Sequence, residues 1–235
     1  MNKRVLISQK GDFYKKLNKC SIKTTLTDKV GEFISFEQYH ADMQCLMVED
    51  TAFVLSCCKN VIDTLNEHYK VIVCDEYDAK YPDNIGLNAL ILGKTLVGKI
   101  SSINPKIIDF CKKHNYSFIN VNQGYTACSC AVVDETSVIT ADNSIYKVLT
   151  NNGYNVLKIN EGHIKLTGAD YGFIGGASAK IENILYFFGN IKKHPDYKRI
   201  KEFCNNRGVN IVSLSNCDLT DIGGIRLLNH WKALP

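Results

Sequence analysis

The sequence predicts an α/β protein built as a closed ring of five repeated units, and three observations support this prediction. A hairpin of two apolar runs joined by a short polar turn recurs along the 235 residues. Its leading strands begin just over 40 residues apart, a period typical of repeat architectures. Helix signals and a further apolar strand follow each hairpin. The two chain ends each hold one more strand, and pairing them would close the ring and hide its sheet edges.

The hairpins supply two strands to each of four units. They are expected at residues 46–48 and 52–55, 90–92 and 96–97, 131–133 and 138–139, and, across a wider turn, 172–174 and 184–188. The repeats are predicted at about 39–80, 82–122, 124–161 and 167–216, and residues 217–235 with the N-terminal strand form the fifth. No linker rich in Pro, Gly or Ser interrupts the chain, so residues 1–235 are predicted to form one domain.

Capping residues or a stripe of apolar residues predict one helix in each of the four complete units. Asn104 and Pro105 stand in the order expected of an N-cap and a first helical position. The other helices are marked by Val61, Ile62 and Leu65 in the first unit, Asp142 or Asn143 and Gly153 in the third, and Pro195 and Gly208 in the fourth. A short helix is also expected near Phe13–Leu17. The closing strands are predicted at 71–73, 118–121, 156–159 and 211–214.

The composition excludes several classes of protein. No apolar run approaches the roughly 20 residues of a membrane span, and no secretory signal is recognisable, so a cytoplasmic location and no membrane partner are expected. A net charge of +4 and a pI near 8.4 are too mild to indicate a nucleic-acid partner. The ten cysteines fall mostly within apolar patterns and are expected to be reduced.

No motif in the sequence indicates a cofactor or a metal. The glycines at 175–176 suggest a phosphate loop, but no lysine occupies the P-loop position. His40, Asp42 and Cys45 match no usual spacing of zinc ligands. Neither a cofactor nor a metal is therefore expected.

A closed ring brings the starts of its leading strands together around one axis, and polar residues at those positions form the candidate site. These residues are His40, Asp42, Asn88, Cys128, Asp170 and Asp221. Converging carboxylates repel one another, and a bound positive charge relieves the repulsion. The sequence therefore predicts an acidic axial pocket for a small cationic molecule.

Two interpretations remain open for each reactive residue. His40 and Asp42 suit general acid/base catalysis, but a histidine that ties down a loop and an aspartate that caps a turn would look the same. Cys128 is either a nucleophile or an inert buried thiol, and it is expected on the same strand face as Cys130.

Five such units around a pseudo-fivefold axis resemble the pentein fold, the β/α propeller of the guanidino-group-modifying enzymes. His40-Ala41-Asp42 resembles the His-x-Asp of the deiminases, and Gly223-Gly224 is similar to the Gly-Gly before their nucleophilic cysteine. The chain most resembles an uncharacterised bacterial branch of the superfamily, through residues 123–126, 162–164, 170–176 and 221–224.

The resemblance implies that a thiolate attacks a guanidinium carbon while a histidine moves protons and carboxylates hold the cation. It also implies that Gly223 and Gly224 line the ligand. Here, however, Ile225–Leu228 follow these glycines where the enzymes have their cysteine. The sequence therefore favours a non-catalytic binder of a small cationic or guanidino-type ligand. The alternative is an amidinohydrolase-like hydrolase or transferase that uses a relocated cysteine, Cys128, with His40.

The C-terminal tail is the remaining candidate for an interaction. His230 and Trp231 belong to no predicted strand or helix of the ring. A surface contact or a homodimer contact is expected there.

Overall fold

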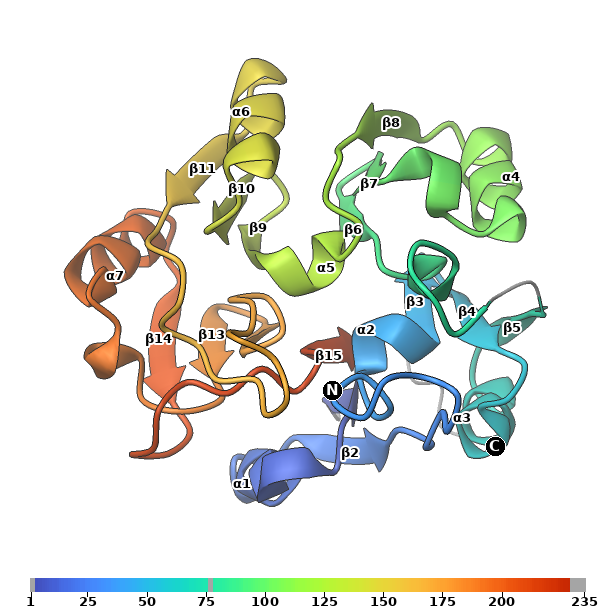
Figure 1. Cartoon of the computed structure of the whole chain (residues 1–235), viewed down its shortest axis with the longest axis horizontal. Coiled ribbons are helices and arrows are strands. Elements are labelled where there is room, and N and C mark those ends of the chain that lie inside the picture. Colours follow the sequence, from blue (N-terminus) through green and yellow to red (C-terminus); the bar gives the residue numbers. More distant parts are fainter. Residues whose placement is uncertain (1–2, 76–77, 229–235) are drawn as a thin grey trace.

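The structure is a computed structural model that describes residues 3–75 and 78–228, and it contains five small three-stranded sheets arranged in a ring (Figure 1). In every sheet the leading strand runs antiparallel to the middle strand, which pairs in parallel with the third. The predicted class, an α/β ring of five ββαβ units, is therefore confirmed. His230 and Trp231 lie outside the described residues.

The strands of the five sheets follow one pattern. The leading strands are β3 (Cys45–Val48), β6 (Leu90–Leu92), β9 (Cys130–Asp134), β12 (Ser178–Ile181) and β15 (Ile225–Leu227). The middle strands are β4 (Thr51–Leu55), β7 (Thr95–Gly98), β10 (Ser137–Thr140), β13 (Ile184–Phe187) and β1 (Arg4–Ile7). The third strands are β5 (Lys70–Cys74), β8 (Ser117–Asn120), β11 (Asn155–Lys158), β14 (Asn210–Ser213) and β2 (Lys23–Leu26).

The helices divide into an outer and an inner group (Figure 1). The outer helices are α1 (Phe13–Lys19), α3 (Lys59–Asn66), α4 (Pro105–Lys113), α6 (Asn143–Asn151) and α7 (Tyr197–Asn205). Each outer helix connects a middle strand to a third strand. The inner helices α2 (Ala41–Gln44) and α5 (Thr126–Ser129) are single turns that lead directly into β3 and β9 near the centre of the ring.

The predicted caps account for where two outer helices begin. The Asn104 side chain accepts a hydrogen bond from the Lys106 amide at 3.0 Å, with Pro105 as the first residue of α4. The Asp142 carboxylate accepts from the Ile145 amide at 2.8 Å at the start of α6. Both bonds satisfy amides that a helix leaves unpaired in its first turn. These two local predictions are confirmed.

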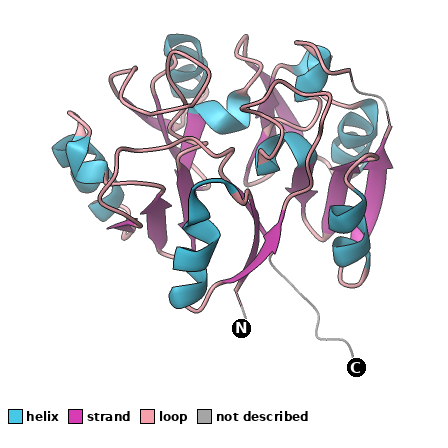
Figure 2. Ribbon diagram, turned by 60° about the horizontal axis from the view of Figure 1, so that its bottom comes forward, coloured by secondary structure: helices cyan, strands magenta, loops and turns pink. Residues whose placement is uncertain are grey.

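The fifth sheet joins the two ends of the chain. Leu6 of β1 lies opposite Arg226 of β15 in an antiparallel pair, and β1 also pairs in parallel with β2. The predicted pairing of the terminal strands is therefore present. Figure 2 shows both ends of the described chain at the same side of the ring.

The leading strand predicted for the fourth hairpin is wrong, whereas its second strand, predicted at 184–188, agrees with β13. Residues 172–174 are loop, and the hairpin is formed by β12 and β13 with a two-residue turn between them. Gly175 lies against α5, because a Cβ there would overlap the backbone carbonyl oxygens of residues 127, 128 and 130. The chain thus passes close to α5 before the strand begins.

The core lies between the sheets and the outer helices and continues around the ring in several clusters of buried side chains. Phe53 of β4 and Phe110 of α4 meet edge to face with ring centroids 5.4 Å apart. These contacts fix the outer frame, and the polar residues described below lie on its inner side. Among residues 3–75 and 78–228, no helix is long and apolar enough to cross a bilayer.

Candidate functional site

The loops that lead into the leading strands converge at one end of the central axis. The chain at Asp42 donates its backbone amide to the carbonyl of Gly223 (3.2 Å), and Gly176 donates to the carbonyl of Cys128 (3.0 Å). Each of these bonds joins loops of two different units. Candidate residues that are far apart in sequence are thereby brought to one place.

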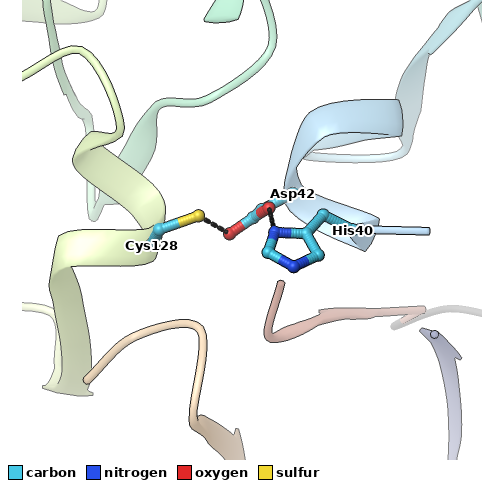
Figure 3. A group of neighbouring side chains, drawn as sticks. All are labelled: His40, Asp42 and Cys128. Carbon is cyan, nitrogen blue, oxygen red and sulfur yellow. Dashed lines mark hydrogen bonds and ion pairs between the residues drawn. The ribbon is translucent and has the colours of Figure 1, made fainter. Parts of the chain in front are cut away.

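His40, Asp42 and Cys128 form the centre of this site (Figure 3). The Cys128 thiol donates a hydrogen bond to Asp42 Oδ2 at 2.6 Å across 86 positions of sequence. His40 Nδ1 lies 3.9 Å from Asp42 Oδ1, which is beyond hydrogen-bond length. All three residues are at most 2% exposed. His40 Nε2 and Asp42 Oδ1 are buried without a hydrogen-bond partner, so the site has unused polar capacity.

The prediction that Cys128 shares a strand face with Cys130 is wrong. Cys128 lies in the helical turn α5, and β9 begins only at Cys130. The turn directs Cys128 toward Asp42, whereas Cys130 belongs to the apolar cluster that includes Val97, Val138 and Leu149. Only one of the two thiols therefore belongs to the site.

Asn88 holds the thiol from the neighbouring unit. Its Oδ1 accepts the Ala127 amide at 2.8 Å, and its Nδ2 lies 3.4 Å from Cys128 Sγ and 3.3 Å from Met43 Sδ. Asn88 is fully buried. The side chain thus connects α5 to the residue that follows Asp42.

Asp221 lies near the other ring nitrogen of His40, Nε2. Its two carboxylate oxygens accept the backbone amides of Phe173 and Gly223, both at 2.9 Å. Asp221 Oδ1 lies 4.0 Å from His40 Nε2. The imidazole of His40 therefore lies between two carboxylates, those of Asp42 and Asp221.

Two glycines make this close approach possible. Gly223 has φ +78°, and a Cβ there would overlap the backbone and side chain of His40. Gly176 faces the Asp221 carboxylate, and a Cβ at that position would overlap it. Gly224 continues the turn with φ +60° and donates its amide to the Gly176 carbonyl at 2.9 Å. The Gly-Gly pair thus sets the spacing between Asp221 and His40.

Burial dominates the protonation of the site. It lowers the pKa of His40 to about 4 and raises the pKa of Asp42 and of Asp221 to about 6 each. Burial also raises the pKa of Cys128 well above 9, and the charges of Asp42 and Asp221 add to the rise. Burial therefore disfavours the charged form of each of these four groups.

Arg226 closes the site on the side of the sheets. Its Nε donates to the carbonyl of Cys45 (2.6 Å) and its Nη2 to the carbonyl of Asp42 (3.2 Å). A cleft of about 600 Å³ runs from the hairpin turns up to Asp42, Gly224 and Arg226 between the leading strands. The guanidinium thus lines the cleft together with Asp42, and its charge acts to lower the pKa of Asp42.

Asp170 is not brought to the other candidates. It is exposed and lies in the wall of a separate cleft of about 520 Å³, together with Lys165 and His194. The sequence placed Asp170 and Asp221 on equivalent strand starts. The fourth leading strand in fact begins eight residues after Asp170, which separates it from the axis.

Several residues around the site were assigned no role in it from the sequence, namely Glu37, Asn84, Tyr125, Gly176 and Arg226. Glu37, Asn84 and Tyr125 lie in the segments that lead into β3, β6 and β9, which carry no periodic pattern. One usable signal was spacing, because each precedes a predicted site residue by three or four positions.

The side chains of His40, Asp42 and Cys128 together have the donor atoms of a metal centre. The ligating atoms of His40, Asp42 and Cys128 all lie within 4.8 Å of one another, the one such group in the described part of the chain. Nitrogen, oxygen and sulfur donors of this kind suit zinc. Cys45, by contrast, is buried with its thiol directed to Met47 Sδ (3.9 Å).

Several solved structures of enzymes are similar to this chain over most of its length. Dimethylarginine dimethylaminohydrolase from Pseudomonas aeruginosa, a cysteine-to-serine variant complexed with citrulline, gives a TM-score of 0.59 at 13% identity and covers 98% of both chains. Agmatine deiminase from C. jejuni gives 0.55 at 11% identity, covering 99% of this chain and 83% of that one. The amidinotransferase SxtG from Microseira wollei, from the saxitoxin biosynthetic pathway, gives 0.55 at 12% identity, covering 99% and 96%. At these identities the similarity establishes the fold, which is that of the pentein superfamily.

Sequence comparison gives a narrower result. No curated protein sequence matches the chain. A profile of one family, described as a family of unknown function (DUF6873), matches residues 6–226. That match spans nearly all of the 235 residues and includes every residue of the site described above. The chain therefore belongs to the DUF6873 family and has the pentein fold.

Proposed function

We propose that this protein is a thiol-dependent hydrolase that acts on the amidino group of a small guanidino or amidino cation. Cys128 is the nucleophile, and His40 and Asp42 move the protons. The observation that supports this most strongly is the Cys128 thiol donating to Asp42 at 2.6 Å, in a buried site that also holds His40. Catalysis, rather than the binding alone that the sequence favoured, is proposed because a cation binder needs the carboxylates but not the thiol.

The charge of the substrate supplies what the free site lacks. Burial and two carboxylates hold the thiol protonated by raising the pKa of Cys128. A planar cation bound beside Asp42, next to the Cys128 thiol, would offset those negative charges and lower the pKa of the thiol. Unpartnered Asp42 Oδ1 is available to accept an N–H of that cation. The nucleophile is thus formed when the correct substrate is bound.

The reaction balances with these groups alone. Cys128 Sγ bonds to the amidino carbon, and its proton passes to Asp42 and then to the leaving nitrogen as that C–N bond breaks. An amidino thioether and a free amine result. Water then adds to the same carbon while His40 takes its proton, the C–S bond breaks, and the proton returns to sulfur. The net change replaces one nitrogen by the oxygen of water.

The solved relatives fit this chemistry by name, since they include a dimethylaminohydrolase, a deiminase and amidinotransferases. All ten cysteines are free thiols. A cytoplasmic location, where thiols stay reduced, is part of the proposal.

The test compares two alkylating reagents that differ in charge. Chloroacetamidine is a cation with the shape of the proposed substrate group, and chloroacetamide is its neutral counterpart. We expect chloroacetamidine to modify Cys128 at least tenfold faster than chloroacetamide does, with exposed Cys20 and Cys217 as internal references for mass spectrometry. Asp42→Asn is expected to remove the preference. Equal slow labelling of Cys128 by both reagents would rule out the proposed nucleophile.

A further inference from the structure

A second set of polar side chains precedes the site residues along three converging loops. Glu37 comes three positions before His40, Asn84 four before Asn88, and Tyr125 three before Cys128. The chain turns between the two sets, since the His40 amide donates to the Glu37 carbonyl (2.9 Å) and the Asn88 amide to the Ile85 carbonyl (2.9 Å). The loops that carry the reacting groups therefore carry this second set next to them.

Hydrogen bonds from Asn84 join the three side chains. Asn84 Nδ2 donates to Glu37 Oε2 at 3.0 Å and to the Tyr125 hydroxyl at 3.2 Å. Glu37 and Asn84 are 5% and 4% exposed. Asn84 Oδ1 is buried with no partner among the described residues. An acceptor that is buried and unused indicates that a donor from outside completes the group.

The ring of Tyr125 lies among other aromatic side chains. It stacks on Tyr81 at 5.8 Å and on Phe173 at 6.4 Å between centroids, and Phe173 in turn meets Tyr171 edge to face. Phe173 is also the residue whose amide holds Asp221. Aromatic faces attract cations. The surroundings of Glu37 thus favour positive charge.

Glu37 itself is a buried acid without a cation. None of the ion pairs formed within residues 3–75 and 78–228 includes Glu37. Burial raises the pKa of Glu37, and the charge of Asp221 adds to the rise, so the two acids are electrostatically linked. With Asp42 and Asp221, Glu37 is the third buried carboxyl group in and around the site.

We infer that Glu37 is a specificity-determining residue that selects substrates by the end remote from the amidino group. Held by Asn84 and Tyr125, its carboxylate binds a cationic or N–H-bearing second group and repels a carboxylate. The preferred class is guanidines with an amine tail, and guanidino acids are rejected. The inference rests on the proposed function, because it takes the amidino group to lie beside Asp42 and Cys128.

Agmatine and arginine are suitable probes because they differ only by one carboxylate. Dissociation constants are measured by calorimetry with full-length protein carrying Cys128→Ala, which prevents turnover. We expect agmatine to bind roughly ten- to a hundredfold more tightly than arginine, because Glu37 repels the carboxylate that only arginine carries; this range is that of one interaction with a charged group. Glu37→Gln, which is isosteric and retains a partner for Asn84, is expected to shrink that ratio at least fivefold. Glu32→Gln is the matched control, since Glu32 is exposed in the same loop, and the ratio is expected to persist.

The outcomes separate the two proposals. Equal affinities in the Glu37-containing protein, or a ratio that survives Glu37→Gln, would overturn the specificity inference and leave the chemistry of Cys128 intact. If neither probe binds and neither protects Cys128 of the unsubstituted protein from chloroacetamidine, the proposed function itself fails, and the inference with it. Should Glu37→Gln not fold, the ratio in the Glu37-containing protein still decides the matter.

Discussion

Replacing Asp42 by asparagine is expected to make the protein more stable above pH 6. The pKa of Asp42 is about 6 in the folded protein because of burial, against an ordinary 3.8. An acid whose pKa is higher in the folded than in the unfolded protein contributes stability that is fully present below the pKa of the unfolded state. That stability is lost as pH rises through the pKa of the folded state. The difference of about two pH units corresponds to about 3 kcal/mol of unfolding free energy, at 1.36 kcal/mol for each unit. The isosteric, uncharged asparagine avoids that loss.

Urea unfolding from pH 3.5 to pH 8 measures the effect. The free energy of unfolding of Asp42→Asn minus that of the unsubstituted protein is expected to rise between pH 4 and pH 6 and to level off about 3 kcal/mol above its value at pH 3.5. His40 and Asp221 titrate in both proteins, so the difference removes most of their contribution. Asp170→Asn is the control for removing a carboxylate outside the site, since Asp170 is exposed.

A flat difference for Asp42→Asn would refute this reasoning, because it would mean that ionising Asp42 costs the folded protein nothing. A difference that falls with rising pH would be stronger evidence still. It would mean that the ionised carboxylate is stabilised by its surroundings, and the account of the site as one that awaits a cation would have to be abandoned.

Three further predictions concern the frame of the site and its donor set. Gly223→Ala is expected to lower the free energy of unfolding, measured in urea, by at least about 2 kcal/mol, because it adds a clash with His40 to a strained φ. Gly153→Ala is the control: Gly153 has φ +83° and open space around it, so the loss should be only about 1 kcal/mol. Equal losses would contradict the close packing at Gly223. Chelator treatment is expected to leave the rate of Cys128 modification by chloroacetamidine unchanged, whereas a faster rate would reveal a thiol held by metal. Asn104→Ala is expected to destabilise α4 by about 1 kcal/mol, measured as a shift of the urea midpoint, and no shift would show that the cap is dispensable.

Local signals explain why so much of the ring could be predicted from sequence. Apolar runs, turn residues and caps such as Asn104 and Asp142 act over a few positions, and tertiary contacts did not override them here. The fourth hairpin failed because its leading strand, Ser178–Ile181, contains Ser178 and Lys180 and so lacks an apolar run, while the apolar residues 172–174 belong to a loop packed against Asp221.

The site could be predicted in part because a ring converts sequence position into spatial position. Residues just before a leading strand meet at the axis, which is how His40, Asp42, Asn88, Cys128 and Asp221 are brought together. The helical turn at α5 could not be foreseen, since four residues carry no periodicity. Glu37 and Asn84 depend on loop paths that no local pattern encodes. The roles assigned to all these residues remain predictions.

The pairing of β1 with β15 has a consequence for when the site can exist. Arg226 in β15 holds the carbonyls of Asp42 and Cys45, and Gly223, just before β15, sets the distance to His40. A growing chain therefore carries His40 and Cys128 long before it carries the strand that secures them. His40 and Cys128 reach their final positions only when β15 pairs with β1 and completes the fifth sheet. Partly synthesised or C-terminally truncated chains would therefore have the side chains of the site without its geometry.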